Sequence, residues 1–236
     1  MLNDIRISLE VEFYLLGDSI DILRDKLTEC LKFPFAVVPE VAYNQYEISV
    51  CRLSIQESIE FINELQKVFF YFKDVYAFPF FDDTKSPNGL HINFISNNFN
   101  SMQYTYSLAD FLCDKLNKVD INDLLQVGKL DFIVKKDRED VRKMLKISAY
   151  NRYISNCIYV PKVLLFSNRF NRTTAIRLIK GYDNLFRLEF RLGYLYCNFS
   201  YLLLFLIDAI RDFNNLKLDY DYLTYVLQYD AQIGFE

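Results

Sequence analysis

Apolar and polar residues alternate along the beginning of the chain. Every second position is apolar, at Ile5, Ile7, Leu9, Val11 and Phe13. The positions between them include Ser8, Glu10, Glu12 and Tyr14. This period of two predicts a β-strand over Ile5–Leu16 with one apolar and one polar face. Both glutamates therefore lie on the polar face of the strand.

Later stretches change to helical spacing. Over Asp18–Leu31 the apolar stripe consists of Ile20, Leu23, Leu27 and Leu31. Over Ser54–Phe72 it consists of Ile59, Ile62, Leu65, Val68 and Phe69. Such stripes predict amphipathic helices, and Ser54 with Glu57 predicts a capping box at the start of the second one. Further helical segments are predicted over Ser107–Leu116, Asp120–Lys146, Phe199–Phe213 and Tyr220–Gln228.

The remaining apolar stretches are short and predict strands. They are Gln45–Leu53, Leu90–Ile95, Lys162–Ser167, Thr173–Ile179 and Phe186–Leu192, with a turn over Asp82–Asn88. No linker rich in Pro, Gly or Ser divides the chain. We therefore predict one α+β domain over residues 1–236, with a helical excursion over residues 101–150. Its curved, mostly antiparallel sheet (a half-barrel) would pack one face on helices and carry polar side chains on the other.

Composition narrows the classes of function. Hydrophobic residues make up 52% of the 236 residues and charged residues 25%, which excludes a disordered chain. The net charge is −4 and no Lys/Arg block is present, so no nucleic-acid partner is expected. The longest apolar run, near Phe199–Ile207, is too short to span a bilayer, so no membrane partner is expected either.

The cysteines and the N-terminus bear on the compartment. The five cysteines show no metal-binding spacing, which favours reduced, buried thiols in a cytoplasmic protein. They are Cys30, Cys51, Cys113, Cys157 and Cys197. The first residues also lack the features of a signal peptide.

Charged residues inside or beside the predicted strands are the candidate chemistry. The acidic and imidazole groups are Glu10, Glu12, Glu40, Glu47, His91 and Glu189. Charges in strand interiors are disfavoured unless they are paired, bind metal or face a cleft. Five clustered carboxylates need cations, and carboxylates with one imidazole suit Mg²⁺ or Mn²⁺.

Each of these residues also has an ordinary explanation when it is taken alone. Glu10 and Glu12 could be solvated on an exposed strand face, and His91 could be a hydrogen-bonded structural residue. Arg187, Glu189 and Arg191 could form a salt-bridge ladder across strands. A structural protein with a charged lining and no ligand is a further alternative. The metal-site interpretation depends on all the segments acting together.

Six segments, in this order, resemble motifs of the glutamine synthetase family of ATP-dependent carboxylate–amine ligases. The likeness extends from about residue 5 to residue 213. The segments are Glu10–Leu15 (Glu-x-Glu-Phe), Glu40–Glu47 (Glu…Gln-x-Glu), Asn88–His91 (Gly-Leu-His), Asn171–Arg177 (Asn-Arg…Ile-Arg), Arg187–Arg191 (Arg-x-Glu-x-Arg) and Asn198–Leu203. Each motif alone is weak, whereas several in the family order are specific. The resemblance implies the family's catalytic-domain fold.

The resemblance also implies a role for each matching residue. One divalent ion would be held by Glu12, Glu40 and Glu47, and a second, beside ATP, by Glu10, His91 and Glu189. Arg172 and Arg177 would contact the transferring phosphoryl group. The nucleotide would be bound by Arg187, Arg177 and Asn93, and the acid substrate by Arg191 and Arg152. The implied cofactors are therefore Mg²⁺ (or Mn²⁺) and ATP.

The implied reaction joins a carboxylate, with glutamate as one candidate, to an amine. The carboxylate takes the γ-phosphoryl group to give an acyl phosphate, and the amine then displaces phosphate. Because the sequence begins almost at the Glu-x-Glu strand, we expect the family's N-terminal β-grasp domain to be missing. The sequence also has no acid just before Pro161, where the family has its flap glutamate. Ammonia is therefore not the expected amine. Ring assembly is not expected, and another homo-oligomer remains open. The alternative function is a non-catalytic nucleotide- and metal-binding relative with a regulatory role.

Overall fold

The architecture comes from a computed structural model, which describes most of the N-terminal half and parts of the C-terminal half. The described residues are 4–15, 17, 19–40, 44–72, 75–77, 89–116, 118–119, 176–180, 186–193, 195 and 197–216. Three predicted segments and one turn lie outside them. These are Asp120–Lys146, Lys162–Ser167, Tyr220–Gln228 and the turn over Asp82–Asn88.

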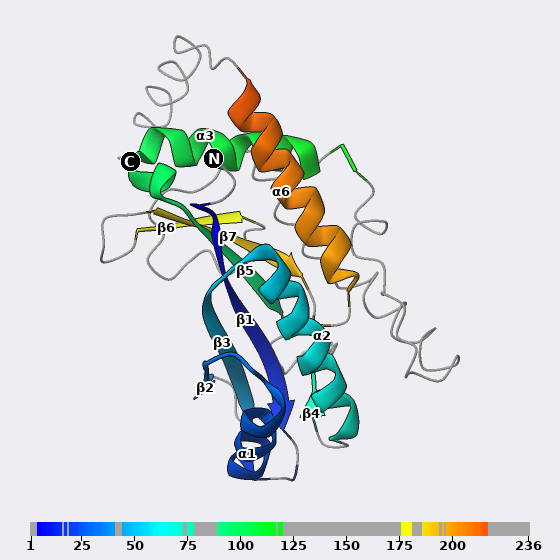
Figure 1. Ribbon diagram of the computed structural model, residues 1–236. Helices are drawn as coiled ribbons and strands as arrows, with labels where there is room; N and C mark the ends of the chain where they lie inside the picture. The colour runs from blue at the N-terminus through cyan, green and yellow to red at the C-terminus, as the bar shows by residue number, and fades with distance from the viewer. Residues whose placement is uncertain are drawn as a thin grey trace.

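The described strands form a single antiparallel sheet in the order β2-β3-β1-β5-β7-β6, with β4 pairing with β1. The strands are β1 (Arg6–Leu15), β2 (Phe35–Pro39), β3 (Gln45–Leu53), β4 (Val75–Tyr76), β5 (Leu90–Ile95), β6 (Ile176–Lys180) and β7 (Phe186–Gly193). The helices are α1 (Ile20–Cys30), α2 (Ile55–Tyr71), the 3₁₀ helix η2 (Asn97–Asn100), α3 (Met102–Leu116) and α6 (Phe199–Asn215). The predicted α+β class, with an antiparallel sheet flanked by helices, is confirmed (Figure 1).

The apolar face of the sheet packs on the helices. The alternating positions of β1 from Ile7 to Phe13 are completely buried and belong to one core cluster with α2 and α6. Phe13 contacts Phe69 of α2 with ring centroids 5.0 Å apart. At the other end of the sheet, Phe213 of α6 contacts Tyr104 of α3 at 5.5 Å. The helices therefore leave the opposite face of β1 to its polar residues (Figure 1).

The predicted capping box at the start of α2 is confirmed. The Ser54 hydroxyl accepts a hydrogen bond from the Glu57 backbone N–H at 3.2 Å. The Glu57 carboxylate accepts one from the Ser54 backbone N–H at 2.7 Å. These two bonds satisfy donors that a helix start leaves without partners, which fixes where α2 begins.

Two irregularities in the strand pairing flank the polar face. Between β5 and β7, Leu90 pairs with Gly193 but Ile92 pairs with Phe190, so β7 has one extra residue opposite His91. Between β1 and β3 a similar shift places an extra residue opposite Ser8. Such β-bulges bend a strand and redirect its side chains.

Some expectations about the elements were wrong. The edge strand β2 was not predicted, and α3 begins at Met102 rather than at Ser107. Cys30 and Cys51 are exposed, whereas all cysteines were expected to be buried; Cys197 is buried as expected. Among the helices that the structure describes, none has the length and apolar character needed to cross a bilayer.

Candidate metal centre

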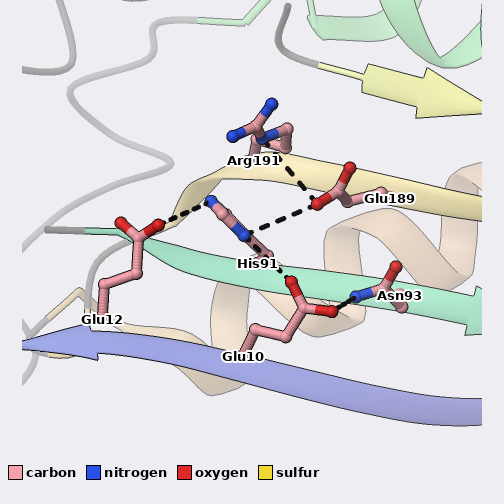
Figure 2. A network of polar contacts seen from close by, with 6 residues as sticks. All are labelled: Glu10, Glu12, His91, Asn93, Glu189 and Arg191. Atoms are coloured by element: carbon pink, nitrogen blue, oxygen red, sulfur yellow. Dashed lines mark hydrogen bonds and ion pairs between the residues drawn. The ribbon is translucent and has the colours of Figure 1, made fainter. Parts of the chain in front are cut away.

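Three neighbouring strands bring the candidate ligands to one face of the sheet. Glu10 of β1 pairs in register with His91 of β5. Two residues further along β5, Asn93 pairs with Glu189 of β7. Because side chains two residues apart share a face, Glu12 joins this group from β1. Figure 2 shows these side chains converging above the three strands.

His91 lies at the centre of the group. Its Nδ1 lies 3.2 Å from Glu10 Oε2 and 3.5 Å from Glu189 Oε1. Its Nε2 lies 4.0 Å from Glu12 Oε1 and makes no hydrogen bond with the described residues. The side chains of His91 and Glu189 are each only 5% exposed. A buried imidazole between carboxylates therefore has one nitrogen without a hydrogen bond, which is a feature of ligand sites.

The geometry of one trio fits a small divalent ion. One ligand atom each from Glu10, His91 and Glu189 lie within 4.8 Å of one another. An octahedral ion about 2.1 Å from its ligands separates neighbouring ligand atoms by about 3 Å and opposite ones by about 4.2 Å. The trio therefore needs only a small inward movement to bind an ion. Two carboxylates with one imidazole suit Mg²⁺ or Mn²⁺.

Two arginines of β7 offset part of the negative charge. Arg191 Nε lies 3.8 Å from Glu189 Oε1. Burial raises the pKa of Glu10, but the hydrogen bond and charge of His91, with the charges of Arg187 and Arg191, outweigh it, so the net pKa lies below 4.5. Glu10 is therefore a carboxylate at neutral pH and can act as a ligand.

A second acidic group adjoins the trio. Glu12 of β1 lies opposite Glu47 of β3, and like charges in this position repel. Burial, followed by the charges of Glu10 and Glu40, raises the pKa of Glu47 from 4.5 to about 7. Excess negative charge therefore extends from the trio towards Glu40, at the end of β2.

The predicted site residues divide into those brought together and those that are not. Of the two predicted ligand trios, only Glu10, His91 and Glu189 converge among the described residues. The other trio does not reach the same mutual proximity there, and its ion stays a prediction. It consists of Glu12, Glu40 and Glu47.

The arginines divide in the same way. Arg187 and Arg191 lie beside the trio, as expected from their shared segment. Arg177 pairs with Glu189 across β6 and β7, but its side chain is outside the described part. Arg152 and Arg172 are outside the described residues altogether, so their predicted roles stay predictions.

Two contacts around the site were not predicted from the sequence. Asn93, expected at the nucleotide, donates a hydrogen bond from Nδ2 to Glu10 Oε1 at 3.2 Å. Gly193 lies where a Cβ atom would come within 2.8 Å of the Leu90 carbonyl oxygen, beside the bulge opposite His91. Residues 91 and 93 share a strand face, but the sequence does not give the register between β1 and β5 on which the Asn93 contact depends, and no sequence signal marks the bulge.

Comparison with known proteins gives a likeness in structure alone. No protein-family model matches the chain, and no curated protein matches it in sequence. Among solved structures, the cryo-EM structure of Plasmodium falciparum glutamine synthetase matches with a TM-score of 0.58 and 15% identity, covering 92% of this chain and 52% of that one. The crystal structure of a glutamine synthase homolog matches with a TM-score of 0.54 and 14% identity, covering 89% of this chain and 55% of that one.

These matches define the fold. The chain has a glutamine synthetase-like fold, and it spans about half the length of the two matched structures. The candidate metal centre lies on the polar face of the sheet of this fold. At 14–15% identity the likeness concerns architecture, and activity has to be argued from the site itself.

Proposed function

We propose that this protein is an ATP- and Mg²⁺-dependent ligase that joins a carboxylate to an amine through an acyl phosphate. The observation that carries the proposal is the convergence of Glu10, His91 and Glu189 from three strands. Three ligand atoms of the preferred types, mostly buried, fit a divalent ion better than they fit a structural ion pair. The glutamine synthetase-like fold supports the same reaction class by analogy.

The residues of the site can bind anionic groups and neutralise their charge. A divalent ion held by Glu10, His91 and Glu189 would neutralise phosphate charge. Arg191, 12% exposed, and Arg187 present guanidinium groups beside that trio, and such groups bind carboxylate or phosphate oxygens in pairs.

These residues would orient the acid substrate beside the phosphoryl group. The substrate carboxylate oxygen attacks the γ-phosphorus and releases ADP, giving an acyl phosphate. The amine nitrogen then attacks the carbonyl carbon, phosphate leaves, and the nitrogen loses a proton. Most of the catalytic effect would be positioning and charge neutralisation, as in other phosphoryl transfers.

One observation favours a second candidate, a non-catalytic protein that binds metal and nucleotide in a regulatory role. The second acidic trio does not converge in the described structure, whereas the proposed ligase uses two ions. A protein with one ion site could bind Mg²⁺–nucleotide without turnover. The two candidates differ in ADP release.

Both candidate functions require Mg²⁺-dependent nucleotide binding. Calorimetry with Mg²⁺ and a non-hydrolysable ATP analogue tests this binding. We expect Glu189→Gln and His91→Ala each to weaken Mg²⁺-dependent nucleotide binding by at least about tenfold, because each removes a ligand. Glu60→Gln, on the exposed side of α2, is the matched control and should bind like the wild type. Unchanged affinity in both ligand variants would overturn the metal centre.

An ADP-release assay over panels of carboxylates and amines then separates the ligase from the binding protein. Release that requires both a carboxylate and an amine supports the ligase. Binding without release on any pair of substrates supports the regulatory role.

A further inference from the structure

Two side chains from a single strand contact Glu10. His91 Nδ1 lies 3.2 Å from Glu10 Oε2, and Asn93 Nδ2 donates to Glu10 Oε1 at 3.2 Å. His91 and Asn93 are two residues apart on β5, so they approach the carboxylate from the same strand face. One oxygen of Glu10 thus faces the imidazole, and the other is occupied by the amide (Figure 2).

The orientation of the Asn93 amide is fixed by chemistry. If the amide were turned over, its oxygen would face the Glu10 oxygen, and two acceptors would repel. Asn93 is 1% exposed, so water cannot replace the bond easily. A buried amide that donates to a carboxylate makes a charge-assisted hydrogen bond, which is stronger than a neutral one.

This arrangement has a consequence for how Glu10 can bind an ion. Glu10 Oε2 lies 3.2 Å from His91 Nδ1, and the same nitrogen lies 3.5 Å from Glu189 Oε1. Glu10 can therefore offer Oε2 to the trio, while Oε1 is engaged by Asn93. If both oxygens bound one ion, Oε1 would have to share its lone pairs between the ion and the Asn93 N–H, which disfavours that arrangement.

We propose that Asn93 is a positioning residue that favours one-oxygen binding by Glu10 and so contributes to a preference of the centre for Mg²⁺ and Mn²⁺ over Ca²⁺. Mg²⁺ requires near-octahedral geometry with short bonds to single oxygens. Ca²⁺ takes six to eight oxygens and often both oxygens of one carboxylate, so freeing Oε1 favours it. This inference rests on the proposed metal centre, and it gives Asn93 a role other than the nucleotide contact that its sequence motif implies.

The variant Asn93→Leu removes the donor and keeps a side chain of similar size. Mn²⁺ affinity is measured by titration with detection of free Mn²⁺ by electron paramagnetic resonance, and Ca²⁺ affinity by competition. We expect the preference for Mn²⁺ over Ca²⁺ to fall by about tenfold, because residues that orient a ligand commonly affect metal affinity by that amount or more. Loss of packing alone would weaken both ions equally and leave the ratio unchanged.

Two further variants make the result decisive. Asn93→Ala, which removes the donor without adding branched bulk, replaces Asn93→Leu if circular dichroism shows that the leucine variant is unfolded. Ser96→Ala is the matched control, because Ser96 is a buried polar residue next to β5 that donates to Asp4 rather than to Glu10. Its ion preference should equal that of the wild type.

The outcomes separate this inference from the proposed function. A folded Asn93 variant with an unchanged ratio, alongside a wild type that binds Mn²⁺, overturns the role of Asn93 and leaves the metal centre standing. A wild type that binds no Mn²⁺ overturns both. A fall in the ratio in the Asn93 variants alone, with Ser96→Ala unaffected, supports both.

Discussion

The clearest electrostatic test concerns Glu47, whose pKa is raised from 4.5 to about 7 by burial and by the neighbouring carboxylates. The folded protein therefore disfavours the ionised form of Glu47 relative to the unfolded chain. The stability that comes from its protonated form is fully present below pH 4.5. It is lost as the pH rises through about 7. In the absence of divalent ions, Glu47→Gln should remove this pH-dependent loss.

The magnitude follows from the two pKa values. A rise from 4.5 to about 7 corresponds to about 3 kcal/mol at pH 8 if the interior were fully shielded from water. The Glu47 side chain is only partly buried, so solvent screening reduces this to about 1–2 kcal/mol. Glu47→Gln should therefore be about 1–2 kcal/mol more stable than the wild type at pH 8 and about equal to it at pH 4.5.

Urea denaturation in EDTA at pH 4.5, 6, 7 and 8 measures this difference. Glu60→Gln, on an exposed position of α2, is the control for removal of a carboxylate and should follow the wild type at every pH. Added Mn²⁺ should narrow the gap at pH 8, because a cation nearby offsets the charge of ionised Glu47. A stability difference between Glu47→Gln and wild type that does not vary with pH would refute the reasoning.

Three further predictions concern the fold and are checked by chemical denaturation. Ser54→Ala removes the capping hydroxyl that Glu57 bonds and should cost about 1 kcal/mol; an unchanged midpoint would contradict the capping argument. Gly193→Ala places a Cβ atom 2.8 Å from the Leu90 carbonyl oxygen and should cost about 1–3 kcal/mol, and a neutral effect would show that β7 can shift. Leu206→Ala, at a completely buried position of α6, should cost about 2–5 kcal/mol; a smaller loss would mean that the core collapses around the gap.

Elements with a strong local pattern were predictable from the sequence. The alternation around Glu10 and Glu12 predicted β1 and its polar face, because the core selects every second residue of a half-buried strand. Ser54 and Glu57 predicted the start of α2, because capping depends on residues that are neighbours in sequence.

The elements that were missed lack such a local signal. The edge strand β2 includes Pro39 and follows Pro34, and prolines normally argue against a strand. The strand exists because its backbone pairs with β3, and that partner cannot be read from the segment itself. The early start of α3 at Met102 has no comparable periodicity to mark it.

The proximity of three candidate ligands could be predicted from the sequence, whereas their contacts could not, and their role as metal ligands stays a prediction. Motif order named Glu10, His91 and Glu189 as one ligand set, and the structure brings them within 4.8 Å. The contact of Asn93 with Glu10 depends on the register between β1 and β5, and a slip of one residue would send every side chain to the other face. Register is set by the whole sheet, so local pattern could not supply it.

The pairing of β1 with β5 and of β5 with β7 has a consequence for folding kinetics. Glu10 meets His91 across 81 residues of chain, and His91 meets Glu189 only after a still longer stretch has closed. Pairings of such high contact order form slowly, because chain entropy is lost before the contacts reward it. An ion that needs ligands from all three strands would bind only after these strands have paired, late in folding. Its main kinetic effect would then be slower unfolding rather than faster folding.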